Sequence, residues 1–200
     1  MPDEEVQERG REGVGMIKAW LEATTWMDFP FNAYEDGDRC TALLLKGKKK
    51  FDLRGFHMGD KSRRHDMSVE CKRYTTKGAQ LAEYRRFLAI AYSAHARTSA
   101  DFGKPLRHAY MWVTSNPFKT DGWSELRTEA AILDAVEDPK HADVIGDNHT
   151  ADHDLVRFVA NDLWLLVFDE DKQIGVTLER DELSKVMTLL NREGPALWHH

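Results

Sequence analysis

Two acidic residues and a lysine lie in neighbouring runs of the sequence that have the character of strands. Asp52 lies in the run KFDLRGF, and Glu70 and Lys72 lie in the run MSVECKRY. Apolar and charged residues nearly alternate in the second run, so on a strand Glu70 and Lys72 share one face and Cys71 lies on the other. Two carboxylates and an ammonium that meet at one sheet edge suit a hard divalent cation and a deprotonated water.

The residue types divide the expected chemistry between a metal ion and a lysine. Asp52 and Glu70 would supply oxygen ligands to Mg²⁺ or Mn²⁺, with the backbone carbonyl of Cys71 as a third ligand. The cation would lower the pKa of a bound water and neutralise charge on a scissile phosphate. Lys72 would orient that water or stabilise the transition state electrostatically. The alternative is a surface ion pair between Glu70 and Lys72, which would contribute only about 0–1 kcal/mol.

The elements that must position these residues follow from hydrophobic periodicity and from turn residues. Apolar residues at helical spacing predict one helix over 4–26 and a second over 80–96. The proline and the Asp-Gly pair in 27–39 predict a loop, as does the polar stretch 58–66. Strands are expected at 40–45, 50–56, 67–74 and 108–115. The expected order is therefore helix, three strands, helix, strand.

The remainder of the chain predicts further elements but no motif. Residues 163–179, LWLLVFDEDKQIGVTLE, are typical of a hairpin. We divide the chain into a core over 1–118 and an extension of unknown role over 119–200 that packs on it. Helices are expected in the extension at 123–136, 154–159 and 181–192. The fold class expected from this pattern is α/β, or α+β.

In that context, residues 12–115 resemble the PD-(D/E)xK nuclease superfamily. Its members share a core of helix, three strands, helix and strand. Asp52 matches the acid of the second strand, and Glu70-Cys71-Lys72 matches the ExK triplet. Phe51 stands where the motif name has proline, a position that varies among members. The resemblance implies a restriction-endonuclease-like fold of a mixed sheet flanked by helices.

Two helices add residues to the site that the resemblance implies. Gln80-Leu81 with Tyr84 matches the QLxxY pattern of the RecB-like branch, so Gln80 and Tyr84 are expected to position Lys72 or a phosphate. The alternative for Tyr84 is a core aromatic with a satisfied hydroxyl. An acid on the first helix often completes the metal site in related members, and Glu12 is the residue expected here.

The function that the resemblance implies is a Mg²⁺- or Mn²⁺-dependent nuclease that hydrolyses phosphodiester bonds, in DNA rather than RNA. Phage defence, restriction and DNA repair are the settings it implies. Many members form homodimers or work inside larger complexes. Two alternatives stay open: a catalytically silent nuclease-like module for binding or assembly, and an effector subunit that a partner or small ligand activates.

The net charge is −6, yet basic residues gather around the candidate site. Residues 46–86 hold thirteen Lys and Arg against five acids, so this segment carries +8 and the remainder −14. Such a concentration is what binding of a phosphate backbone needs, although a solvated lysine-rich hairpin at KGKKK would look the same. The residues expected to hold the backbone are Lys48, Lys49, Lys50, Arg73, Lys77, Arg85 and Arg86.

Composition bounds the remaining possibilities. Hydrophobic residues make up 42% of 200 residues, enough for a substantial core. No apolar run reaches the roughly 18 residues of a membrane span, and the charged N-terminus is not a secretory signal. Cys40 and Cys71 form no CxxC pair, so reduced thiols in a cytoplasmic protein are expected. His149 and His153 have a spacing that binds zinc on a helix, but no pattern places a third ligand.

Overall fold

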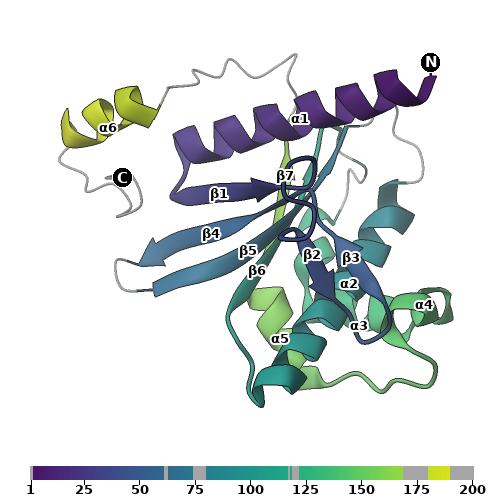
Figure 1. Ribbon diagram of the computed structural model, residues 1–200. Helices are drawn as coiled ribbons and strands as arrows, with labels where there is room; N and C mark the ends of the chain where they lie inside the picture. The colour runs from purple at the N-terminus through teal and green to yellow at the C-terminus, as the bar shows by residue number, and fades with distance from the viewer. Residues whose placement is uncertain are drawn as a thin grey trace.

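A mixed five-stranded sheet forms the centre of the molecule (Figure 1). The computed structural model describes residues 2–60, 63–73, 80–116, 118, 122–168 and 180–189. The strand order is β1 (Met27–Asn32), β4 (Leu53–Asp60), β5 (Arg63–Lys72), β6 (His108–Thr114) and β7 (Leu163–Val167). The first three strands are antiparallel, β6 runs parallel to β5, and β7 runs parallel to β6.

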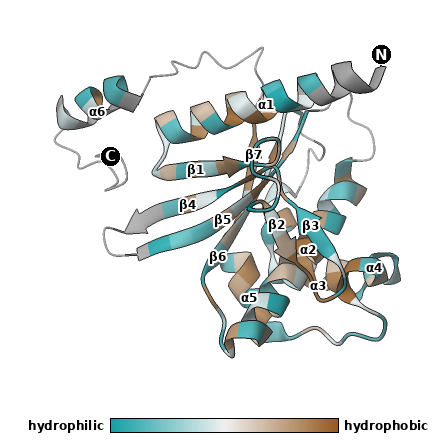
Figure 2. Ribbon diagram, viewed as in Figure 1, coloured by the Kyte–Doolittle hydropathy of each residue, from teal (hydrophilic) through white to brown (hydrophobic). Residues whose placement is uncertain are grey.

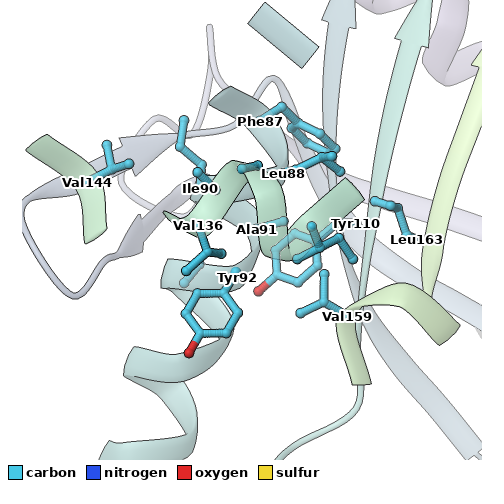
Figure 3. Packing of buried hydrophobic residues seen from close by; sticks show 14 of the residues in the cluster. Phe87, Leu88, Ile90, Ala91, Tyr92, Tyr110, Val136, Val144, Val159 and Leu163 are labelled. Carbon is cyan, nitrogen blue, oxygen red and sulfur yellow. The ribbon is translucent and has the colours of Figure 1, made fainter. Parts of the chain in front are cut away.

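Helices cover both faces of this sheet (Figure 1). Helix α1 (Pro2–Thr24) packs on one face, while α2 (Gln80–Phe102), α3 (Glu129–Glu137) and α5 (His153–Asn161) pack on the other. Because side chains of a strand alternate between faces, each strand contributes side chains to both layers. In β6, Met111 lies in the cluster under α1, whereas Trp112 lies in the cluster under α2. Figure 3 shows the larger cluster, in which α2 contributes Phe87, Leu88 and Tyr92.

The predicted α/β class and several predicted elements are confirmed. The first helix, expected over 4–26, is α1, and the second, expected over 80–96, is α2 and extends to Phe102. The apolar run at 108–115 is the buried strand β6. Cys40 and Cys71 are both free thiols, as expected.

The loop predicted over 27–39 is wrong in its first half, because Met27–Asn32 forms the edge strand β1. Pro30 suggested a loop since proline cannot donate to a β-ladder. On an edge strand that loss is tolerated, and the pairing of β1 with β4 shifts register between Asp28 and Phe31, around the proline. Gly55 of β4 makes the close approach possible, since a Cβ there would collide with the Asp28 carbonyl.

The loop predicted over 58–66 is also wrong, because β4 continues to Asp60 and β5 begins at Arg63. This end of the hairpin is polar and its exposed Arg64 guanidinium lies over the Phe56 ring. Backbone pairing, which polar side chains do not prevent, carries the strands beyond the apolar part of the sheet.

The strands predicted over 40–45 and 50–56 do not form one hairpin. Strands β2 (Thr41–Leu43) and β3 (Lys48–Lys50) form a separate two-stranded sheet, with Gly47 at φ +84° in its turn. The chain then changes partners: the Phe51 N–H donates to the Cys40 carbonyl at 3.0 Å, and the Asp52 N–H donates to the Val69 carbonyl at 3.0 Å. Asp52 therefore lies where the chain passes from the small hairpin into the main sheet.

The extension expected after residue 118 contributes to the same sheet and the same core. Its described part holds the 3₁₀ helices η1 (Trp123–Arg127) and η2 (Pro139–His141), and the helices α3, α4 (Ala142–Ile145) and α5. The first half of the hairpin expected at 163–179 is β7, and its second half lies outside the described residues. Helix α6 (Arg180–Leu189) corresponds to the helix expected at 181–192. Among the described helices, none is long and apolar enough to span a membrane.

Candidate metal centre

Asp52 is held against the end of β5 by its own backbone and by its side chain. Besides the bond from its N–H to Val69, its Oδ2 accepts a hydrogen bond of 2.7 Å from the Cys71 N–H. The carboxylate therefore bonds to the Cys71 N–H, which would face residue 51 if β4 extended farther toward its N-terminus. Local chain geometry, not a flexible side chain, fixes its position.

Glu70 lies beside this carboxylate and is almost completely buried. Its side chain is 6% exposed, and its Oε1 accepts from Lys49 Nζ at 2.8 Å and from Lys72 Nζ at 3.0 Å. Its Oε2 is buried and has no hydrogen-bond partner among the described residues. A buried carboxylate oxygen without a partner is costly, and a donor or a cation bound to it would remove that cost.

Repulsion between the two acids is visible in the pKa of Asp52. Burial and the neighbouring Glu70 raise this pKa from 3.8 to about 6, although the Cys71 N–H, Lys49 and Lys72 act in the opposite direction. The protein alone thus does not hold two full negative charges here without cost. A divalent cation between the carboxylates would favour the charged form of both.

Lys72 remains a cation in this setting. Burial would lower the pKa of its ammonium, but the Glu70, Asp52 and Glu83 carboxylates outweigh burial and raise it. Its Nζ lies 3.7 Å from Glu83 as well as 3.0 Å from Glu70. Lys72 is therefore positioned as a fixed positive charge next to the acidic pair.

The backbone of β5 adds a third oxygen on the same side. In an extended strand the N–H and C=O of one residue point to the same side. Because the Cys71 N–H faces Asp52, the Cys71 carbonyl faces it too, while the Lys72 carbonyl faces β6 and accepts from the Ser115 N–H at 3.0 Å. Two carboxylates and one carbonyl are the hard oxygen ligands that Mg²⁺ and Mn²⁺ accept.

The structure does not bring Glu12 to this pair. A small cleft of about 60 Å³ separates α1 from Asp52 and Lys72, and α1 lines it with Gly10 and Gly13. Glu12 lies off this helical stripe, is exposed, and does not line the cleft. The described residues contain no group of three or more His, Cys, Asp and Glu side chains arranged to hold a metal. Any metal here would rely on two carboxylates and the carbonyl.

Gln80 and Tyr84 are buried in the core of the α2 layer. The Gln80 Oε1 accepts a hydrogen bond of 3.0 Å from the Thr114 hydroxyl, which ties the start of α2 to the end of β6. The Tyr84 hydroxyl donates to the Leu126 carbonyl at 2.8 Å, and burial raises its pKa. Tyr84 therefore has the satisfied core position that was the alternative to a role in the site. Gln80 is thus bonded to the residue of β6 that pairs with Lys72.

Sequence patterns missed two residues of this centre. Lys49 was expected only to hold a nucleic-acid backbone, yet it is bonded directly to Glu70. Tyr34, in the turn after β1, lines the cleft beside Asp52, and burial together with Asp52 raises the pKa of its phenol. Tyr34 has no sequence signal, but the alternation of three lysines in β3 could have indicated that Lys49 points opposite to Lys48 and Lys50.

The other residues expected at a nucleic-acid backbone differ in their availability. Lys48, Lys50, Arg73 and Arg85 are exposed. Arg86 is bound by both oxygens of Asp143, at 2.9 and 2.5 Å. Lys77 lies outside the described residues.

The two histidines with the spacing of a zinc site have different surroundings. His149 shares a 3.1 Å hydrogen bond with the Tyr92 hydroxyl, while the exposed His153 begins α5.

Comparison of the chain with protein-family models, with curated proteins and with solved structures finds no match in any of the three. Function must therefore be argued from the chemistry of the centre itself.

Proposed function

We propose that this protein is a metal-dependent nuclease that hydrolyses phosphodiester bonds in nucleic acid, DNA in preference to RNA. The observation that carries the proposal is the convergence of Asp52, Glu70 and Lys72, with one buried Glu70 oxygen that lacks a partner among the described residues. A surface ion pair would not need a second carboxylate whose pKa is raised to about 6.

The order of the elements supports the same proposal. Helix α1, the antiparallel strands β1, β4 and β5, helix α2 and the parallel strand β6 follow one another in the order that the resemblance to PD-(D/E)xK nucleases implies. Hairpin β2–β3 is inserted between the first and second of these strands. A restriction-endonuclease-like fold is the finer class that we propose for this sheet.

Each residue has a definite part in the proposed reaction. Asp52, Glu70 and the Cys71 carbonyl would hold Mg²⁺ or Mn²⁺. The ion supplies Lewis acidity at the phosphate and makes a bound water more acidic. The Lys72 ammonium would hold the attacking water or a non-bridging phosphate oxygen, where negative charge increases in the transition state. Gln80 would hold Thr114, the residue of β6 that pairs with Lys72, and so help to keep Lys72 in place.

The test is cleavage of linear DNA, circular DNA and RNA with Mg²⁺ or Mn²⁺, and with EDTA as the blank. Wild type is compared with Lys72→Ala and Asp52→Asn, and with Lys104→Ala as a control on an exposed lysine that follows α2. We expect metal-dependent cleavage that falls by about a hundredfold or more in the first two variants, and by less than about threefold in the control.

Cleavage that survives Lys72→Ala and Asp52→Asn would refute the assignment of the site. Absence of cleavage by every protein, together with retained nucleic-acid binding, would favour the second candidate, a catalytically silent binding or assembly module. One observation speaks for that candidate: Lys49 and Lys72 already neutralise Glu70 without a metal. A silent protein that gains activity when a partner or small ligand is added would instead be an effector subunit.

The wider setting is proposed on the resemblance alone. Phage defence, restriction and DNA repair, a cytoplasmic location, and assembly as a homodimer or within a larger complex are the settings and states it implies.

A further inference from the structure

Lys49 enters the candidate centre from an element outside the main sheet. Strand β3 presents Lys48 and Lys50 to solvent, whereas the Lys49 side chain is 26% exposed and its Nζ lies 2.8 Å from the Glu70 Oε1. The β2–β3 hairpin is fixed on α2, because the Leu45 N–H donates to the Ser93 hydroxyl at 2.9 Å. The hairpin thus places Lys49, and neither of its two neighbours, next to the buried Glu70 carboxylate.

The charges around Glu70 are balanced before any metal arrives. Lys49 and Lys72 both bind one of its oxygens, while Asp52 is close enough to repel it. A divalent cation bound through the second oxygen would place its charge within a few ångström of two ammonium groups. Repulsion at that range is strong in a partly buried site, so one lysine must move when the metal binds.

We propose that Lys49 is a tethered counterion that a divalent cation displaces from Glu70, after which its ammonium binds a phosphate of the nucleic acid. The inference rests on the proposed function, because it assumes that Glu70 binds a metal. It adds a residue and a consequence. Metal and nucleic acid bind cooperatively, because the metal releases the Lys49 ammonium for a phosphate, and a phosphate that binds this ammonium leaves Glu70 available to the metal.

The geometry selects Lys49 over Lys72 as the lysine that moves. Lys72 lies two residues from Glu70 on the same strand and has a second carboxylate, Glu83, at 3.7 Å. Glu70 is the only acid within ion-pair distance of Lys49 in the described part of the chain. A hollow of about 260 Å³ lies next to both lysines, bounded by Arg86, Phe87 and other side chains of the α2 layer. This hollow gives the Lys49 stem room to turn toward a bound phosphate.

The first part of the test measures Mn²⁺ binding without nucleic acid, by electron paramagnetic resonance of the free ion. We compare wild type with Lys49→Met, which keeps the stem but removes the charge, with Lys49→Arg, which keeps the charge, and with the matched control Lys48→Met. Lys49→Met is expected to bind Mn²⁺ about tenfold more tightly than wild type. Lys49→Arg and Lys48→Met are expected to stay within about twofold of wild type.

The second part measures the affinity for a short DNA duplex in Ca²⁺, with gels to verify that the duplex is intact. Lys49→Met is expected to bind DNA about threefold to tenfold more weakly than wild type, since a phosphate contact is lost. A tighter affinity for Mn²⁺ together with a weaker affinity for DNA identifies a lysine that competes with the metal and binds the substrate. A variant that merely unfolds would lose both affinities.

The outcomes separate this inference from the proposed function. If Lys49→Met binds Mn²⁺ no more tightly than wild type while Glu70→Gln binds none, the metal site stands and the role of Lys49 is refuted. If neither wild type nor Lys49→Met binds Mn²⁺, the proposed function fails and the inference fails with it.

Discussion

At the scale of single residues, the burial of Glu70 is the feature that most needs an explanation. A carboxylate 6% exposed is tolerated only when its charge is compensated, and two lysines provide that compensation at one oxygen. The other oxygen has no partner among the described residues. Stability alone would be served better by an apolar side chain, which points to a role in binding for the pair that Glu70 forms with Asp52.

Asp52 gives this centre a characteristic dependence on pH. Its pKa in the folded chain is about 6, above the ordinary value of 3.8, chiefly through burial and then through Glu70. The folded chain therefore holds an extra proton between these values, and the free energy of unfolding decreases as the pH rises through that window. We expect Asp52→Asn, which can still accept from the Cys71 N–H, to be more stable than wild type by about 1–3 kcal/mol at pH 7 without metal.

Thermal unfolding of both proteins from pH 4 to pH 8 checks this expectation. The difference should be small near pH 4, grow up to about pH 6.5 and then stay constant. Saturating Mg²⁺ should reverse the order at pH 7, because only wild type keeps the full set of ligands. The exposed Asp66 of β5 is the control, and Asp66→Asn should shift stability by less than about 0.5 kcal/mol. A difference that does not vary with pH would show that Asp52 titrates normally.

The central residues of the site could be predicted because their signal is local. Alternation along one strand places Glu70 and Lys72 on one face, and an acid at the start of the preceding strand brings Asp52 beside them. Lys49 could not be placed in the same way. Its contact with Glu70 depends on how a separate hairpin sits on α2, and that packing has no periodic signature in the sequence.

At the scale of elements, one serine of α2 forms a hydrogen bond with the turn of the β2–β3 hairpin. The Ser93 hydroxyl accepts from the Leu45 N–H at 2.9 Å and donates to the Val144 carbonyl at 2.6 Å, and it is fully buried. It therefore joins the hairpin, α2 and α4. In Figure 2 strand β3 is hydrophilic, and the apolar contacts of the hairpin come from Leu44, which is buried in the core cluster, and from Ala42 and Leu45, which pack against it.

A pair of serines on α2 tests this role. Ser93→Ala should lower the free energy of unfolding by about 1–3 kcal/mol, because the Leu45 N–H loses its acceptor and the Val144 carbonyl keeps only the Lys46 N–H as a donor. Ser99→Ala is the matched control: the Ser99 hydroxyl is buried without a hydrogen-bond partner in the described part of the chain, so its removal should be neutral or stabilising by up to about 1 kcal/mol. Urea unfolding measures both. Equal losses would mean that the helix, and not the hairpin contact, responds to the change.

The errors in element prediction have a common physical cause. Pro30 and the polar residues of 58–66 indicate loops when only the neighbouring residues are considered. Strand β1 tolerates its proline because it lies at the sheet edge, and the hairpin of β4 and β5 continues because its backbone groups pair with each other. Which strand lies at an edge is a property of the whole sheet and cannot be predicted from the neighbouring residues alone.

At the scale of the whole molecule, charge is distributed unevenly across an acidic protein. Several basic residues of 46–86 are already paired in the folded chain, among them Lys46 with Asp147 and Arg86 with Asp143. Lys48 and Lys50 project from β3 and have no ion-pair partner among the described residues. The positive charge available to a polyanion is therefore smaller than the sequence suggested, and Lys48 and Lys50 of the hairpin beside Glu70 supply part of it.

Charge reversal on the hairpin tests whether this surface contacts a phosphate backbone. The double variant Lys48→Glu/Lys50→Glu should bind a DNA duplex at least about tenfold more weakly at low salt, and the slope of log affinity against log salt should become less steep by about 2. Fluorescence anisotropy in EDTA, over a range of salt concentrations, measures both quantities without cleavage. The exposed Lys104, which follows α2 at the opposite end of the sheet from Lys72, provides the control.

Lys104→Glu changes net charge by the same amount per residue, so it should weaken binding by less than about twofold and leave the slope unchanged, because distant charges are screened. If this variant weakens binding as much per charge as the hairpin variant does, the affinity for nucleic acid depends only on the net charge of the protein. The candidate centre would then have no adjacent binding surface, and the second candidate function would lose its support along with the first. A loss confined to the hairpin would place the nucleic-acid backbone next to Lys49 and the two carboxylates.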